Sequence, residues 1–204
     1  IRNTPNMYAI FGGDMVDSIH EKDKRFAEGE VAEWCKPTEA NRARWGKTLI
    51  ERQRKYALAK WRPLAEAGKI LCIHAGNHED TLVARDSIDL TGYWAEELNV
   101  PYAGLAALSN LFIRTPGGGP SRNTNRVTFY TTHGGGSAMT PGSRLNKVAS
   151  LLHGYDVDVA LMWHLHFKTH MTMTTLGITD TGRRRVRNRV AAMCGPFLDG
   201  HKEG

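Results

Sequence analysis

Residues 69–79 read Lys-Ile-Leu-Cys-Ile-His-Ala-Gly-Asn-His-Glu, an apolar run followed by small and polar residues. A short apolar run of this kind predicts a buried strand, and Gly76–Glu79 would then lie at the carboxyl end of that strand. Ligands bind at the carboxyl ends of the strands in open α/β sheets. The stretch therefore predicts both an α/β fold and a polar site at the edge of its sheet.

The same pattern of an apolar stretch followed by a polar residue recurs three times in the chain. It places Asp14, then His133, and finally the pair His164 and His166 directly after strand-like segments. On an extended chain, side chains at positions i and i+2 point to the same face. Both imidazoles of the last pair are therefore expected to reach one polar cluster.

These strand ends carry the donors of a metal site that contains no thiolate. Asp14 offers a carboxylate able to bridge two cations, Asn77 a carbonyl oxygen and His133 an imidazole nitrogen. Mixed nitrogen and oxygen ligation suits Mn²⁺, Fe, Zn²⁺ or Ni²⁺ rather than Ca²⁺. Taken singly, His133 is better explained as a loop or structural histidine, and the other residues are compatible with turns or caps. Their joint placement at strand ends favours a metal site.

The order of the motifs resembles that of the calcineurin-like metallophosphoesterases, whose blocks run D-x-H, G-D-x-x, G-N-H-E/D, a lone His and G-H-x-H. The last four blocks are matched by Gly13-Asp14, Gly76-Asn77-His78-Glu79, His133 and Trp163-His164-Leu165-His166, although Trp163 replaces the usual Gly. The resemblance covers about residues 7–166. It implies that residues 1–204 form a single α/β domain, a metallophosphoesterase-like two-sheet sandwich flanked by helices.

The resemblance also implies a binuclear metal centre and a role for each residue. Asp14 would bridge two divalent ions, with Asn77, His133 and His164 on one ion and His166 on the other. His78 would face the phosphate and stabilise or protonate the leaving oxygen, and Asn77 would also contact the substrate. Glu79 is expected to cap the following helix or to support a ligand imidazole. The two ions would activate a water molecule for hydrolysis of the phosphoester.

The first D-x-H block of the family has no counterpart ahead of Asp14. The one such triplet in the chain, Asp199-Gly200-His201, is out of order, and a turn explains it better than a permuted block does. We therefore expect an N-terminal segment that carries the block to precede Ile1. Without that block, the second ion retains only Asp14 and His166 as ligands.

Helices are expected to link the strands. A charged segment from about Glu21 to Glu33 is predicted to be helical, and a long helix is predicted from residues 37–38 to about Ala67, where Gly68 ends it. This helix and the strands over 7–11 and 69–74 predict a parallel crossover. The other expected elements are helices over 80–84, 91–98 and 143–153, a loop over 117–125, and strands over 101–114, 126–131, 157–162, 167–175 and 185–193.

Composition favours an intracellular protein with anionic partners. The cysteines Cys35, Cys72 and Cys194 form no C-x-x-C pair, which argues against a disulfide framework. No apolar run is long enough to cross a membrane, so we expect a cytoplasmic protein without a membrane partner. The formal net charge of +6 favours phosphates or nucleic acid as partners.

A dense basic run lies near the C-terminus and comprises Arg183, Arg184, Arg185, Arg187 and Arg189. In a strand, alternate members of this run would share one face. A solvated face or a charge-protected edge strand is the favoured explanation. A track for a phosphate backbone is the functional alternative.

The leading hypothesis is metal-dependent hydrolysis of phosphoesters, with phosphodiesters such as nucleotides or nucleic acid favoured by the charge. A phosphomonoesterase or phosphoprotein phosphatase is the nearest alternative. A non-catalytic binding module on the same scaffold is the alternative from a different class. The presence of His78 beside the expected ligands argues against that module, because a pure scaffold has no need of it.

Overall fold

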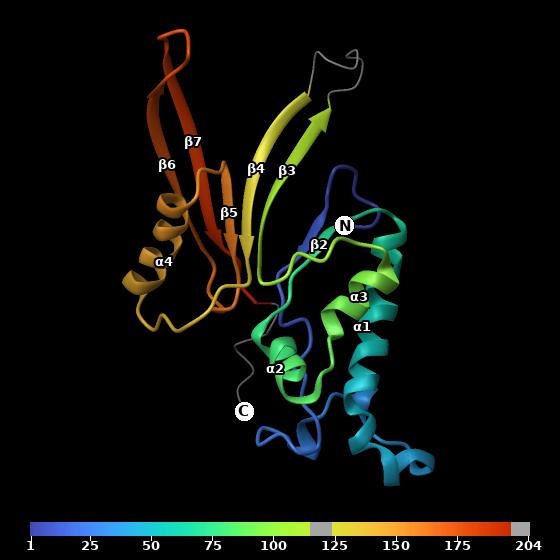
Figure 1. Ribbon diagram of the computed structural model, residues 1–204. Coiled ribbons are helices and arrows are strands. Elements are labelled where there is room, and N and C mark those ends of the chain that lie inside the picture. Colours follow the sequence, from blue (N-terminus) through green and yellow to red (C-terminus); the bar gives the residue numbers. More distant parts are fainter. Residues whose placement is uncertain (115–123, 197–204) are drawn as a thin grey trace. The chain divides into compact units, whose positions relative to one another are not determined.

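The structure is a computed structural model that describes residues 1–114 and 124–196 (Figure 1). It confirms the α/β class. The chain divides into two compact units, Ile1–Gly104 and Leu105–Gly204, and each unit has its own sheet and its own hydrophobic core. The organisation of the chain as one domain stays a prediction.

The first unit is built on two parallel strands, β1 (Ala9–Phe11) and β2 (Ile70–Ile73), with the helix α1 (Leu49–Glu66) between them in sequence. The parallel pairing predicted for this strand–helix–strand segment is confirmed. Gly68 follows α1 with a φ of 63°, a left-handed conformation that ends the helix as expected.

Two further helices, α2 (Asn77–Asp86) and α3 (Leu90–Leu98), follow β2. The Asp89 side chain caps α3 by accepting a hydrogen bond from the Gly92 N–H at 2.7 Å. Trp94 of α3 is fully buried, and its indole N–H donates to the Arg54 carbonyl of α1 at 3.1 Å. Both helices were predicted, but α2 begins at Asn77, so the polar residues 77–79 form its first turn.

The long helix predicted from residues 37–38 is wrong in its first third, and so is the helix predicted over 21–33. Short 3₁₀ turns replace them. Their bounds are Glu28–Glu30, Glu33–Cys35, Glu39–Arg44 and Gly46–Thr48. The Trp45 indole N–H donates to the Cys35 carbonyl at 2.6 Å, and both residues pack with Leu49 in a small core of their own. This local packing, together with the poor helix propensity of Gly46, outweighs the helical pattern.

The second unit is a five-stranded mixed sheet with the order β3-β4-β5-β7-β6. Its strands are β3 (Ala106–Arg114), β4 (Thr124–Thr132), β5 (Val159–Met162), β6 (Thr169–Ile178) and β7 (Arg184–Met193). The strands β4, β5 and β7 run parallel, and the outer strands β3 and β6 pair antiparallel with their neighbours. The helix α4 (Pro141–Gly154) buries Val148 and Leu152 in the core of this unit.

The central strand β5 is much shorter than its neighbours. It has four residues, whereas β4 has nine and β7 has ten. It therefore pairs only with Phe129–Thr132 of β4 and Val190–Met193 of β7. The remaining length of the two hairpins, β3–β4 and β6–β7, pairs only within each hairpin, and Figure 1 shows these ends as two separate ribbons.

The basic run lies on β7, where two of its arginines are structural. The Arg187 Nε donates to Asp158 Oδ1 at 2.8 Å, and Arg187 also pairs with Asp156. Arg189 is buried, and its Nε donates to the Val157 carbonyl at 2.8 Å. A solvated face and a phosphate track are therefore both wrong for these two residues. The edge-strand explanation stays a prediction, because β5 pairs only with Val190–Met193 of β7 and the part of β7 that carries the arginines pairs with β6 alone.

The remaining expectations concern the cysteines, membrane-spanning helices, and two short segments of the sequence. The cysteines Cys35, Cys72 and Cys194 are free thiols, as expected, and burial raises the pKa of Cys72 to about 11. Within residues 1–114 and 124–196, no helix has the length and apolar character needed to cross a membrane. The triplet Asp199-Gly200-His201 and most of the expected loop over 117–125 lie outside the described residues.

Asp158 is a connecting point of the second unit. Its carboxylate accepts hydrogen bonds from Arg187 and from the backbone N–H and hydroxyl of Thr128, the latter two at 2.8 and 2.7 Å. Burial raises the pKa of this carboxyl, but the hydrogen bonds from Arg187 and Thr128 outweigh burial and leave the pKa at about 2. The charged carboxylate therefore stabilises the fold.

Replacing Asp158 by Ala is expected to lower the free energy of unfolding by about 2 kcal/mol at neutral pH, because Arg187 loses its partner. The folded-state pKa lies below the ordinary value of 3.8. The contribution is therefore complete above about pH 4 and is lost as the pH falls toward 2. Urea unfolding of the unaltered protein and of Asp158→Ala between about pH 4 and pH 2 measures this contribution. The exposed Asp180→Ala variant is the control. A loss that is independent of pH would contradict the explanation.

Candidate functional site

Asp14 lies in the loop directly after β1, and this loop packs backbone against backbone on the end of β2. Gly13 has a φ of 86°, and a Cβ atom at this position would lie 2.6 Å from the Ala75 carbonyl oxygen. Position 13 therefore requires glycine both for its conformation and for space. Asp14 itself has a φ of 52°, so the loop turns sharply at the candidate ligand.

Gly76 allows the Asp14 carboxylate to lie over the N-terminus of α2. A Cβ atom at position 76 would lie 2.1 Å from Asp14 Oδ1 and 2.2 Å from the Asp14 backbone nitrogen. With glycine there, Asp14 Oδ1 accepts a hydrogen bond from the His78 N–H at 3.0 Å. The first N–H groups of a helix have no partner within the helix and favour a negative charge, so the carboxylate is stabilised at this position.

Glu79 joins the Asp14 loop to the start of α2. Its side chain is buried, and its Oε2 accepts hydrogen bonds from the N–H groups of Asp14 and Gly76, both at 3.0 Å. Its Oε1 accepts from the Met15 N–H at 2.8 Å. The expected capping role is confirmed, since Glu79 reaches back to the residue before α2. The bonds to the Asp14 loop were not foreseen, although a Glu three residues after an N-cap is a recognisable signal for the cap itself.

Two carboxylates therefore lie close together at one helix N-terminus. Burial raises the pKa of the Glu79 carboxyl, and the neighbouring charge of Asp14 raises it further, while hydrogen bonds from Met15 and Asp14 oppose the rise. A cation bound to Asp14 would offset the repulsion between the two groups. The chemistry at Asp14 is therefore compatible with a metal ligand.

The other expected residues of the first unit lie in the first turn of α2. Asn77 is its first residue and has an exposed side chain, whereas the side chain of His78 is half-buried. Their roles as ligand and proton donor stay predictions. His74 is fully buried, and its Nδ1 lies 3.0 Å from the Gly104 carbonyl oxygen, which gives it a structural role.

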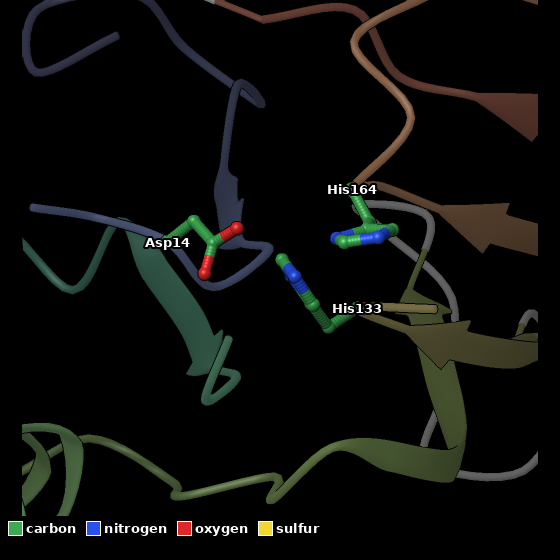
Figure 2. Close-up of side chains that lie close together, drawn as sticks. All are labelled: Asp14, His133 and His164. Carbon is green, nitrogen blue, oxygen red and sulfur yellow. The ribbon is translucent and has the colours of Figure 1, made fainter. Parts of the chain in front are cut away.

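In the second unit, His133 and His164 follow the neighbouring parallel strands β4 and β5. His133 is 1% exposed, and its backbone N–H donates to the Leu105 carbonyl at 2.9 Å. The two imidazole rings lie 5.1 Å apart between centroids at an angle of 67°. Each ring has a nitrogen within 4.8 Å of a nitrogen of the other. Of the side chains expected to share one metal ion, the two histidines are thus brought together (Figure 2).

The extended chain expected over residues 164–166 is wrong. The strand β5 ends at Met162, and the Leu165 N–H donates to the Trp163 carbonyl at 2.9 Å, which closes a tight turn. His164 and His166 have φ values of 71° and 48°, a conformation that histidine adopts rarely. His166 is exposed. The argument that both imidazoles share a face because the chain is extended therefore fails, and the ligand role of His166 stays a prediction.

Among the described residues, the candidates for metal binding are Asp14 in the first unit and His133 and His164 in the second (Figure 2). All three were expected from the sequence. Carboxylate oxygens and imidazole nitrogens are donors that suit a divalent transition metal. A comparison with known proteins found no matching family model, no matching curated protein and no matching solved structure. The resemblance to metallophosphoesterases therefore rests on the motifs.

The Gly76→Ala variant tests the close approach of the Asp14 loop to α2. We expect it to lower the free energy of unfolding by about 2–4 kcal/mol, because the added methyl group would overlap the Asp14 backbone nitrogen, which a rotation of the Asp14 side chain cannot relieve. Urea unfolding followed by far-UV circular dichroism measures this change. Gly29→Ala is the matched control, since a Cβ there meets no atom within 4 Å. Equal stability of the two variants would contradict the close approach.

Proposed function

We propose that the chain is a metal-dependent phosphoesterase of the calcineurin-like type, with phosphodiesters such as nucleotides or nucleic acid as its favoured substrates. The observation that carries the proposal is the pair His133 and His164, whose ring nitrogens converge from two neighbouring strand ends. His133 is buried and His164 is half-buried, and neutral imidazole nitrogens are common ligands of transition metals. The order of the motifs in the sequence supports the phosphoesterase class and the proposed roles of the other site residues.

In this proposal, one divalent ion would be held by Asp14, Asn77, His133 and His164. A second ion would be held by Asp14 and His166. Mn²⁺, Fe, Zn²⁺ or Ni²⁺ would suit the donors. The proposal carries with it the family's two-sheet sandwich flanked by helices.

Bound divalent ions would supply Lewis-acid stabilisation of the phosphoryl oxygens and would lower the pKa of a water molecule. The chain's own part is positioning and proton transfer. His78 is proposed to donate a proton to the leaving oxygen, because its imidazole is half-buried while its backbone is fixed to Asp14 at 3.0 Å. The N-terminal N–H groups of α2 favour an anion beside it.

The proposed setting is the cytoplasm. The thiols of Cys35, Cys72 and Cys194 are free, which suits a reducing compartment. The formal net charge of +6 suits a phosphorylated partner. The exposed arginines at the start of β7, Arg184 and Arg185, remain available for a polyanionic substrate, whereas Arg187 and Arg189 are committed to the fold.

Substrate class is tested with the protein loaded with Mn²⁺. We expect faster turnover of bis-p-nitrophenyl phosphate than of p-nitrophenyl phosphate, because the proposed substrate is a diester. The release of p-nitrophenolate measures both rates. A strong preference for the monoester would contradict the diester class. Absence of bound metal together with absence of hydrolysis would contradict the proposal of an enzyme and favour the non-catalytic binding module.

The roles of the two kinds of histidine are separated by paired variants. His78→Ala should lower the turnover number about 100- to 1000-fold, the usual worth of a proton donor, with metal content unchanged. His133→Ala should lower the metal content itself. The exposed His153→Ala on α4 is the control for both measurements. Metal analysis and steady-state kinetics read out the two effects, and loss of metal in His78→Ala would refute its proposed role.

A further inference from the structure

The first unit contains a cavity of about 390 Å³ that the proposed phosphoester chemistry does not use. It lies between the loop that follows Asp14, the segment 25–35 and α1. All of its lining residues belong to the first unit. Its volume falls within the range of sites that bind small molecules.

Four aromatic side chains form part of the wall of this cavity, beside a larger number of aliphatic ones. Trp34 and Tyr56 stack with their ring centroids 3.9 Å apart and their planes within 6°. They keep 42% and 36% of their surface exposed. Phe26 and Trp61 also line it. Flat aromatic surfaces attract another flat ring more strongly than they attract a saturated group of equal size.

The main polar side chains of the lining already form hydrogen bonds within the protein, and its positive and negative charges are equal in number. Gln53 accepts a hydrogen bond from the Ser18 N–H at 3.0 Å and donates to the Ile19 carbonyl at 2.8 Å. Arg25 makes two hydrogen bonds of 3.0 Å to Asp23. The charged side chains of the lining are two cations and two anions: Arg25, Lys60, Asp17 and Glu30. Neither charge nor the amide of Gln53 therefore selects a charged or strongly hydrogen-bonding ligand.

We propose that this cavity binds a small molecule through an uncharged, planar aromatic ring system of one or two fused rings. The ring is held by the aromatic wall around Trp34 and Tyr56. The site goes beyond phosphoester hydrolysis and does not depend on it, because none of the proposed metal ligands lines the cavity.

The test uses 2-naphthol as the probe and the full chain as the protein, with a chelator present so that metal sites play no part. Isothermal titration calorimetry should show one saturable site. Decahydro-2-naphthol has the same carbon skeleton without aromatic rings, and we expect it to bind at least about fivefold more weakly. Absence of saturable binding, or equal affinity for the two compounds, would overturn the proposal.

Two variants locate the site. Trp34→Ala should weaken 2-naphthol binding about five- to tenfold, because one stacking surface is lost. Ala27→Trp adds bulk to the lining and removes no contact, so it should abolish binding even if Trp34→Ala were to fold poorly. Tyr102→Ala, an exposed aromatic residue outside the cavity, should bind as the unaltered chain does. Circular dichroism confirms folding. Unchanged binding in Ala27→Trp would place the site elsewhere and reject the proposal.

Discussion

The buried carboxylate of Glu79 holds the polar edge of the first unit together. It is the common acceptor for the N–H groups of Asp14, Met15 and Gly76, which belong to two segments about 60 residues apart in sequence. A buried N–H group left without a partner costs about 1–3 kcal/mol, so loss of this acceptor would release both segments at once. The orientation of the Asp14 carboxylate over α2 is therefore set by Glu79 as much as by Asp14 itself.

The loop after β1 is anchored a second time, at its other end, by Gln53 of α1. The amide of Gln53 binds the backbone of Ser18 and Ile19, while Glu79 binds that of Asp14 and Met15. The short stretch between the two anchors lines the cavity on one side and carries Asp14 at its start. The candidate ligand and the aromatic cavity thus share one loop that two buried polar side chains hold in place.

The strands and most helices were predictable because short apolar runs are bounded by glycine or polar residues, as around Gly68 and Gly76. Residues 37–48 were not, because their 3₁₀ turns depend on the contact between Trp45 and the Cys35 carbonyl. The candidate ligands Asp14, His133 and His164 were found from their positions after strands. The bend at His164 was not, since a left-handed histidine leaves no signal in composition or periodicity. The hydrogen bonds from the Asp14 loop to Glu79 could not be predicted either. Their donors are backbone N–H groups, and the sequence does not indicate which backbone groups a side chain will bind.

The shortness of β5 has a consequence for how the second unit opens. Only Phe129–Thr132 of β4 and Val190–Met193 of β7 share a neighbour on β5, so the hydrogen bonds there are protected from both sides. Amide hydrogens in that central block should exchange with solvent far more slowly than those near the ends of the two hairpins. The sheet then consists of a slow-exchanging centre and two arms that open independently, each without disturbing the strand ends that carry His133 and His164.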